Sequence, residues 1–506
     1  MSLLDRGRAL TQGQLTTVEL AVAAVLLLVL TVMVVTLSPI YVFGFLGVVV
    51  GSLVFIARPD IGLLGYFTFR MVADLLWWLP INVGGLSILQ VLSGGATALA
   101  AIVFFVELRK VERHPAFAPL MVYLAVMALA AIRSGDLRDA LEIFAVYTSP
   151  FLIMFLVTAV FRTPQDWRKV VGLVSVVGLI PVLESVYEFG SGQMASVSLA
   201  GINRLLGGYE NLHNHAHMMA VLTMLYGFWY FYLPNGWKRW AAGGAAVAAL
   251  FCLYMSYVRT PVLGIAVFAV LFPILERRWI YLVLAGVGAL GLLAVSETVR
   301  ERFAELLLVF DTSDVTMDYF RVGSGRMGIW TVSMQQFLKR PVMDLVLGAG
   351  LGGHWEMVQA YVDQYRPVRG GTLNPHNDYL TLLYQLGPVS VICYVTMQLL
   401  VVYHALKLKR RTKDRFKQVF ASYAATLAVL VFPVNMASNS FVERVTPAML
   451  LWTMAGLLYS MVRHENELES GALAPQPAAP PVTRMRPRAP PPSLPRPPRA
   501  RVEEVP

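Results

Sequence analysis

A histidine at a predicted helix start is the residue in this sequence best suited to acid–base chemistry. His376 lies in the segment NPHNDYLTLLYQLG, where a polar stretch turns into an apolar run. Pro375 is favourable near a helix start, and Asn377 or Asp378 can cap free backbone N–H groups. The positive end of a helix disfavours an imidazolium, so His376 would stay neutral, as a general base requires. A histidine that only caps the helix is the structural alternative.

A second group consists of arginines in short connections that the predicted topology places outside the cell: Arg133, Arg138, Arg204, Arg259 and Arg444. These residues run against the usual bias of Lys and Arg toward the cytoplasm. Arg259 is the clearest case, because in SYVRTPVLG it stands where one apolar run breaks into another. A guanidinium binds phosphate through two parallel hydrogen bonds, so such arginines suit a diphosphate with its lipid tail in the membrane. The alternative is an arginine that extends from a helix end to the membrane surface.

The segment GSGRMGIWTVSMQQF, residues 323–337, is a third candidate. It predicts a short amphipathic helix with Ile329, Trp330 and Phe337 on or near one face. Such a helix could lie on the membrane surface and carry Arg326 toward the same site. A packed loop helix with a solvated arginine is the alternative.

Three glycines, Gly348, Gly350 and Gly353, satisfy the pattern G-x-G-x-x-G. A dinucleotide-binding fingerprint also needs a preceding strand and a following helix within a βαβ unit. The external loop predicted here offers neither, so we predict no nucleotide cofactor.

Three histidines, His213, His215 and His217, suggest zinc at first sight. Side chains with this spacing converge on one ion only if the backbone is irregular, and Glu210 is the one acidic residue close by in the sequence. We therefore predict no metal site, and no cofactor of any kind.

The elements that must position these residues are membrane helices. Of the 506 residues, 57% are hydrophobic and 14% are charged, against roughly 25% charged in soluble domains. Apolar runs long enough to span a bilayer recur along the chain, so we predict an all-α polytopic membrane protein with about 14 (12–14) helices. The predicted helices are 18–37, 40–57, 61–80, 86–107, 116–132, 139–161, 169–189, 216–233, 240–257, 260–275, 279–296, 377–403, 417–437 and 446–463.

The distribution of Lys and Arg predicts the orientation, with a cytoplasmic N-terminus at residues 1–17. Transmembrane helices 1–11 follow over residues 18–296, and helices 12–14 occupy residues 377–463. Between them, residues 297–376 form one large periplasmic loop with short amphipathic helices. The Pro- and Arg-rich residues 464–506 predict a disordered cytoplasmic tail.

The net charge of +10 comes from basic residues spread over many short loops, which excludes a nucleic-acid-binding surface. Cys252 and Cys393 both lie inside apolar runs, so a disulfide framework is not expected.

Two motifs resemble those of a known family. His376-Asn377, followed after nine residues by Gly387, resembles the His-Asn/Ser/Gln-x9-Gly motif of the O-antigen ligase and polysaccharide polymerase superfamily of bacterial inner-membrane glycosyltransferases. Arg259-x-x-x-Leu263 is similar to the Arg-x-x-x-Leu motif of the ligases.

Two further regions support the resemblance. Arg326 with Trp330, followed by the glycine-rich stretch that ends at Gly353, looks like the family core that precedes the histidine. Arg204, with the glycines and Asn214 that follow it, loosely resembles the family's Arg-Gly-Asn-Pro-Asn region.

The resemblance implies a metal-independent, inverting transfer of glycan from an undecaprenyl-diphosphate-linked donor at the periplasmic face of the inner membrane. His376 would activate the acceptor hydroxyl, while Arg259, Arg326 and Arg204 would bind the diphosphate. The supporting positions would be Asn377, Gly387, Leu263 and Trp330. The implied partners are the donor, a glycan or lipid A core acceptor, membrane lipids and other polysaccharide assembly proteins.

Other functions fit the sequence less well. A glycosyltransferase with paired acidic residues on its first external loop is excluded, because that connection is little more than Ser38-Pro39. A lipid-linked oligosaccharide flippase would more often show internal repeats and a central polar cavity. Within the superfamily, Pro388-Val389-Ser390 departs from the residues often seen in ligases, so ligase, polymerase and protein oligosaccharyltransferase all stay open.

Overall fold

The computed structural model describes residues 57–76, 114–194, 203–295, 326–353, 375–437 and 445–471, with shorter pieces within 50–55, 82–87 and 297–300 and residue 101. The chain divides into two units, residues 1–464 and residues 465–506. The predicted helix 18–37, nearly all of helix 86–107, most of the loop 297–376 and the tail beyond Gly471 lie outside the described residues.

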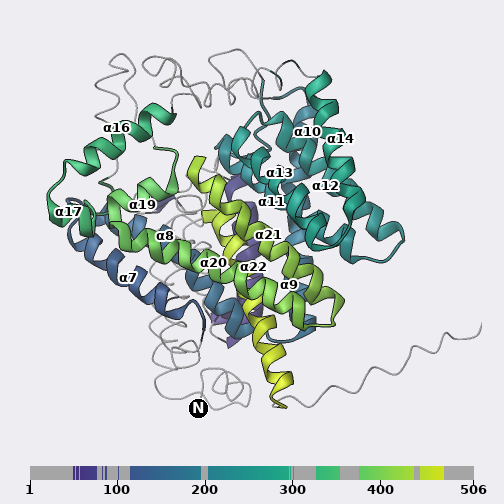
Figure 1. Cartoon of the computed structure of the whole chain (residues 1–506), viewed down its shortest axis with the longest axis horizontal. Coiled ribbons are helices and arrows are strands. Elements are labelled where there is room, and N and C mark those ends of the chain that lie inside the picture. The colour runs from purple at the N-terminus through teal and green to yellow at the C-terminus, as the bar shows by residue number, and fades with distance from the viewer. Residues whose placement is uncertain are drawn as a thin grey trace, which may run out of the picture. The chain divides into compact units, whose positions relative to one another are not determined.

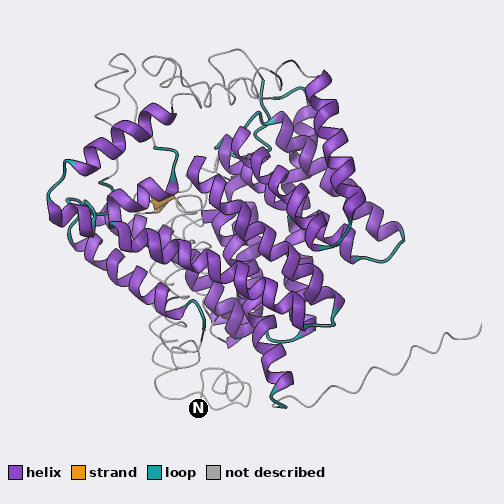
Figure 2. Ribbon diagram, in the orientation of Figure 1, coloured by secondary structure: helices purple, strands orange, loops and turns teal. Residues whose placement is uncertain are grey.

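The described residues form helices almost throughout, which confirms the predicted all-α class (Figure 2). The helices labelled in Figure 1 and used below are α4 (Pro59–Ala73), α7 (Phe117–Ile132), α8 (Leu137–Val160), α9 (Pro164–Val177), α10 (Leu179–Ser191), α11 (Leu212–Tyr232), α12 (Trp237–Met255), α13 (Arg259–Leu275), α14 (Trp279–Val295), α16 (Arg326–Leu338), α17 (Val342–Leu347), α19 (Asp378–Leu386), α20 (Pro388–Arg411), α21 (Arg415–Ala437) and α22 (Val445–Glu469).

One short stretch of the described chain departs from this pattern. Strands β1 (Asn82–Val83) and β2 (Leu86–Ser87) pair antiparallel, with Asn82 opposite Ser87 and Val83 opposite Leu86. The sequence predicts a helix from residue 86, so the first two residues of that helix are instead part of a strand pair. The short 3-10 helix η1 (Asp74–Leu76) follows α4.

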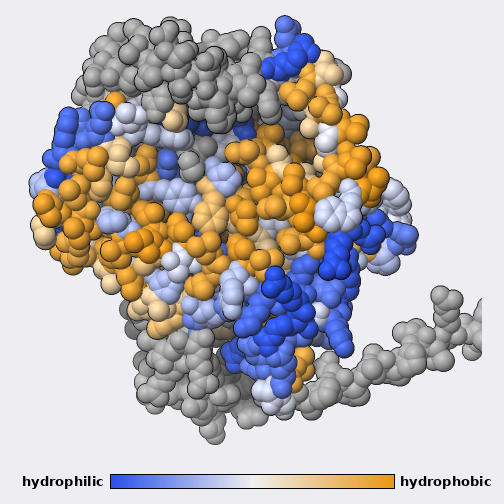
Figure 3. Space-filling view, viewed as in Figure 1, coloured by the Kyte–Doolittle hydropathy of each residue, from blue (hydrophilic) through white to orange (hydrophobic). Residues whose placement is uncertain are grey.

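Five helices in the described part are long and apolar enough to cross a membrane: Leu137–Val160, Pro164–Ser191, Pro388–Arg411, Arg415–Asn435 and Val445–Glu469. Figure 3 shows an extensive apolar surface on the face in view. Many large hydrophobic side chains are exposed, for example those of Val287, Leu290 and Ile392. Lipid contact explains this exposure. The protein is therefore a multi-pass membrane protein, while the total of about 14 spans stays a prediction.

Local capping signals explain several helix boundaries. Helix α9 begins with a capping box, in which the Thr163 side chain accepts from the Asp166 N–H and Asp166 reaches back to the Thr163 backbone. Asp136 caps α8 in a similar way. Because such signals act within one turn, they are readable from sequence alone. Helix α9 nevertheless begins at Pro164, five residues before its predicted start at 169, and α7, which has no side-chain cap, begins within one residue of its predicted start.

Two predicted helices have a glycine at an internal junction: the one through Gly178 stays a single span, Pro164–Ser191, whereas the one through Gly387 is interrupted. The predicted helix 169–189 corresponds to α9 and α10, which meet at Gly178. A Cβ on Gly178 would lie 2.3 Å from Leu222, so close packing requires glycine there. The predicted helix 377–403 corresponds to α19 and α20, which are separated by Gly387.

Gly348 and Gly387 allow the segment after α17 to pack closely against the C-terminal end of α19. Gly387 has φ +77°, and a Cβ there would lie 2.2 Å from the carbonyl oxygen of Val346. Gly348 has φ +76°, and its Cβ would lie 2.2 Å from the carbonyl oxygen of Gln385. The N–H of Ala349 donates to the Tyr384 carbonyl at 2.7 Å. The glycine-rich stretch thus follows a helix, α17, and packs on the end of α19, which is not the setting of a dinucleotide fingerprint.

Gly387→Ala should destabilise the protein by about 2–4 kcal/mol, because the new Cβ adds a steric clash to an unfavourable backbone conformation. Gly192→Ala is a matched control, since Gly192 has φ +71° and a Cβ added there would meet nothing within 4 Å. Thermal unfolding of the detergent-purified variants measures the difference. Equal losses for the two variants would show that the contact with Val346 contributes nothing.

Packing among the described helices brings the sequence candidates into one region. Helix α11 packs against α12, α13 and α21, and α19 packs against α16, α17, α20 and α21. Figure 1 shows α16, α17 and α19 as neighbours. Helices that carry Arg259, Arg326 and His376 are therefore linked through direct packing partners.

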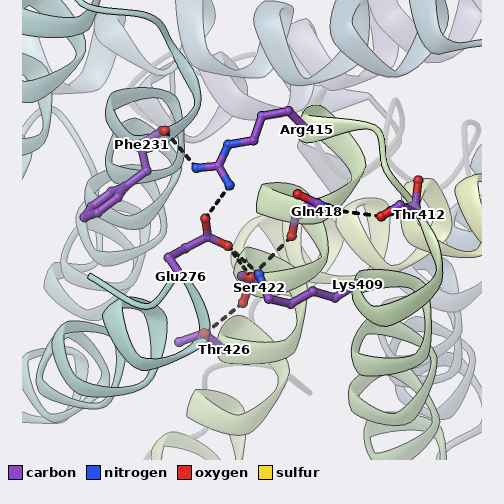
Figure 4. Close-up of polar contacts among 8 residues, drawn as sticks. All are labelled: Phe231, Glu276, Lys409, Thr412, Arg415, Gln418, Ser422 and Thr426. Carbon is purple, nitrogen blue, oxygen red and sulfur yellow. Dashed lines mark hydrogen bonds and ion pairs between the residues drawn. The ribbon is translucent and has the colours of Figure 1, made fainter. Parts of the chain in front are cut away.

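A buried ion cluster joins the C-terminal end of α13 to the connection between α20 and α21 (Figure 4). The Glu276 side chain is 1% exposed and accepts hydrogen bonds from Lys409 at 2.7 Å, Arg415 at 2.8 Å and Ser422 at 2.6 Å. Burial raises the pKa of Glu276, but the hydrogen bonds from Lys409 and Ser422 and the charges of Lys409 and Arg415 outweigh it and lower that pKa. The cluster stabilises α13 from the end opposite to Arg259.

Glu276→Gln should lower the free energy of unfolding by about 2–4 kcal/mol near neutral pH, because it leaves Lys409 without its buried partner. The folded pKa of Glu276 is depressed, so the contribution is present above the unfolded value of about 4.3. It is lost as pH falls through the lower folded value.

Thermal unfolding at several pH values between neutral and strongly acidic checks this expectation. Asp60→Asn is the matched control, because the Asp60–Arg58 pair is exposed and such pairs contribute little. A difference between wild type and Glu276→Gln that did not shrink on acidification would contradict the assignment.

Candidate functional site

His376 occupies the position just before the capping residue of α19. Its φ is +51°, in the left-handed region that residues other than glycine seldom adopt. Such a conformation costs of order 1–3 kcal/mol and persists only where the surroundings impose it. The imidazole is half-buried. The backbone therefore holds this ring in a conformation that the local sequence alone would not favour.

Contacts on both sides of His376 account for that conformation. The indole N–H of Trp330 in α16 donates to the carbonyl of Pro375 at 2.9 Å. Asn377 caps α19, and its side-chain oxygen accepts from the Leu380 N–H at 3.1 Å. Trp330 and Asn377 thus lie where the sequence analysis places supporting residues, one on each side of the histidine.

Arg259 and Arg326 begin two different helices that meet. Arg259 is the first residue of α13, and Arg326 is the first residue of α16. The Arg326 Nη1 atom donates to the hydroxyl of Thr260 at 3.4 Å. Burial, and then the positive charge of Arg259, lower the pKa of Arg326. Two neighbouring like charges in a partly buried place favour an anion between or beside them.

A second histidine faces the first. The ring centroids of His213 and His376 are 6.1 Å apart, with their planes tilted by 41°. His213 lies in the first turn of α11, whose capping residue Asn211 accepts from the His213 N–H at 2.8 Å. His213 is half-buried, like His376. The N-terminal ends of α11 and α19 therefore present imidazole rings to the same place.

The other two histidines of the triplet have different neighbours. The Nε2 atom of His215 is 2.9 Å from the hydroxyl of Ser185. The Nδ1 atom of His217 is 2.7 Å from the His213 carbonyl oxygen, one turn earlier in the same helix. Within the described residues no three His, Cys, Asp or Glu side chains are arranged to hold a metal ion.

Arg204 lies in the loop between α10 and α11. The N–H of the next residue, Leu205, donates at 3.2 Å to the carbonyl of Met255, which ends α12. This bond places the Arg204 loop beside the turn that leads to Arg259. Arg204 is half-buried, and its Nε atom has no hydrogen-bond partner among the described residues. A buried guanidinium N–H of this kind is suited to a ligand oxygen.

Three helix N-termini carry residues of the site. His213 and Arg259 lie in the first turns of α11 and α13, and His376 lies just before α19. Free N–H groups and the helix dipole give each N-terminus a partial positive charge, which attracts phosphate and carboxylate. The site combines these backbone charges with guanidinium groups and two imidazoles. Chemically, it can bind a multiply charged anion and accept a proton beside it.

Other residues predicted from the sequence have different surroundings. Leu263 is 47% exposed on α13, as expected of a residue that faces lipid. Gly387 ends α19 and shapes the connection to α20, so its role is structural. Arg138 is exposed on α8, and Arg444 lies outside the described residues.

Arg133 has a structural partner instead of a ligand. Its guanidinium donates to the carbonyl of Gly348 at 2.7 Å and to the carboxylate of Asp344 at 2.6 Å. Arg340 also donates to Asp344 at 3.3 Å. These bonds fasten α17 to the end of α7, so the outside position of Arg133 is explained by tertiary contact.

Sequence reasoning missed three residues of the site. In the sequence Thr260 stands out only as part of a helix break, and His213 only as a member of a triplet unsuited to metal. Glu188 was not singled out, although its side chain accepts from two backbone N–H groups in the Arg204 loop. A carboxylate at the end of an otherwise apolar run was the available signal, because such groups are seldom buried without a partner.

Comparison with known proteins points to a family. The family model described as O-antigen ligase matches residues 244–395. This segment contains Arg259, Arg326 and His376, whereas Arg204 and His213 precede it. No curated protein matches the chain.

Proposed function

We propose that this protein transfers or polymerises glycan from an undecaprenyl-diphosphate-linked donor onto an acceptor hydroxyl, because residues 244–395 match the O-antigen ligase family model. The acceptor is another glycan or the lipid A core. The observation that carries this proposal is the juxtaposition of Arg259, Arg326 and His376 within the matched segment.

The diphosphate of the donor is bound by arginine. Arg259 and Arg326 supply two neighbouring positive charges, and the buried Nε of Arg204 supplies a further donor. Guanidinium groups form paired hydrogen bonds with phosphate oxygens, and they stabilise the charge that grows on the diphosphate as it leaves. Because these groups can replace the charge of a divalent ion, the reaction is proposed to need no metal.

His376 acts as the general base. As the acceptor oxygen attacks the anomeric carbon, the hydroxyl proton passes to a ring nitrogen of His376. The bond between that carbon and the diphosphate oxygen breaks, and its electron pair stays with the lipid diphosphate. One displacement of this kind inverts the anomeric configuration. His376 suits this role because its backbone is held on both sides and its ring is half-buried.

The site is proposed to lie at the periplasmic face of the bacterial inner membrane. The support is the distribution of Lys and Arg, which puts the connections carrying Arg204 and Arg259 outside. A cysteine introduced into residues 297–375 should then react with a membrane-impermeant thiol reagent added to intact spheroplasts. Labelling only after lysis would contradict this orientation.

Deleting the gene and separating the cell's surface glycans on a gel tests the function and distinguishes its forms. Loss of a polymerase should leave single repeats on the acceptor. Loss of a ligase should leave long chains on the carrier lipid. Loss of a protein oligosaccharyltransferase should leave both patterns intact and remove glycan from protein. An unchanged set of glycans and glycoproteins would refute the proposal.

A further inference from the structure

A buried carboxylate organises the loop that carries Arg204. Glu188 lies near the end of α10 and is 9% exposed. One of its oxygens accepts from the N–H of Leu206 at 3.1 Å, and the other accepts from the N–H of Gly207. Two hydrogen bonds from backbone N–H groups to one carboxyl group make this a strong polar contact between α10 and the loop.

The loop is shaped to receive that carboxylate. Gly207 has φ +56° and Gly208 has φ +76°, a left-handed conformation that glycine adopts without a steric penalty. A Cβ on Gly207 would lie 2.2 Å from the Ser185 hydroxyl and 2.6 Å from the ring of His215. The loop therefore cannot move toward α10 and α11, and Glu188 prevents it from moving away.

The same contacts determine where Arg204 lies. Leu205 is bonded to Met255 on one side, and Leu206 is bonded to Glu188 on the other. The backbone that follows Arg204 is thus held relative to both α12 and α10. Among the described residues no ion pair joins Glu188 to Arg204. The carboxylate is bonded to the backbone of the loop.

We propose that Glu188 is a positioning residue for the donor diphosphate, acting through Arg204. This inference rests on the proposed function, because it takes Arg204 to be a diphosphate ligand. Removing the negative charge of Glu188 should release the Leu206 and Gly207 amides and displace Arg204. Donor binding then weakens, while the step catalysed at His376 is left nearly unchanged.

Binding of undecaprenyl diphosphate to the full chain in detergent tests this, together with steady-state kinetics of transfer. Glu188→Gln and Arg204→Ala should each raise the Kd by about tenfold, the size expected for a lost charged hydrogen bond. The double variant should bind no more weakly than Arg204→Ala. In the kinetics, Glu188→Gln should raise the KM for donor and change kcat much less. The matched control is Asp139→Asn, an exposed carboxylate in the first turn of α8, which should bind as wild type does.

The measured affinities of these variants decide whether Glu188 acts through Arg204. Wild-type affinity for Glu188→Gln, or losses that multiply in the double variant, would overturn the inference, because Glu188 would then not act through Arg204. If Glu188→Gln does not fold, Glu188→Asp keeps the charge but shortens the side chain. A folded Asp variant with weakened binding supports the inference, and one with wild-type affinity overturns it. A wild-type protein that does not bind undecaprenyl diphosphate would refute the proposed function instead.

Discussion

His376→Ala should reduce glycan transfer by at least about 100-fold, the smallest loss expected when a general base is removed. The variant should still insert and purify normally, because the histidine precedes the helix and the cap supplied by Asn377 remains. His376→Gln should be as inactive as the Ala variant, since an amide keeps a hydrogen bond but cannot accept the proton. The measurement is transfer by purified enzyme from a lipid-linked glycan donor.

His404→Ala is the matched control for this experiment. His404 is also half-buried, but it packs against Tyr403 and Tyr459 instead of the site. Its replacement should leave transfer within about twofold of wild type, as for a residue outside the catalytic machinery. Normal glycan output from His376→Ala would remove this residue from the catalytic role.

Running the wild-type assay with a chelator tests the need for metal. Activity lost on chelation and restored by a divalent ion would contradict the proposed chemistry.

Arg259→Lys should lower kcat/KM for the donor by about 10²–10³-fold, the range seen when a group that stabilises transition-state charge is lost. Lysine keeps the charge but not the planar pair of donors that matches a phosphate. Arg326→Lys should have a comparable effect, and it also disturbs the hydrogen bond to Thr260. Steady-state kinetics with varied donor measures both variants.

Arg138→Lys provides the comparison for the arginine variants. Arg138 is another arginine on the side predicted to be external, but it is exposed on the first turn of α8. Its replacement should not change kcat/KM. Full activity of Arg259→Lys would indicate that Arg259 anchors a helix end at the membrane surface and does not bind diphosphate.

Membrane insertion and local helix boundaries were predictable because their signals are short. Apolar runs predict helices wherever they occur, and Asn377 marks the start of α19 through a bond to a residue three positions away. The break at Gly387 was missed, although Gly387-Pro388 is a common helix-ending pair. The reason is physical: the glycine is required by the carbonyl of Val346, which belongs to a different segment.

The arginines show the limit of this reasoning most clearly. Arg133 and Arg259 look alike in sequence, because both are predicted to be external and both border apolar runs. In the structure Arg133 is bonded to Asp344, in α17, far along the chain. Arg259 instead lies beside another guanidinium, that of Arg326. No local pattern distinguishes the two, since the difference lies in the partner and not in the residue.

Hydropathy and capping were enough to establish that this chain is a multi-pass membrane protein and that His376 stands at a helix start. Both signals operate over a few residues, so the order of amino acids contains them directly. The folded arrangement was needed to show that His213 faces His376, that Arg326 meets the start of α13, and that Glu188 holds the Arg204 loop. These contacts between residues distant in the sequence depend on which helices pack together, and packing is a property of the whole folded chain.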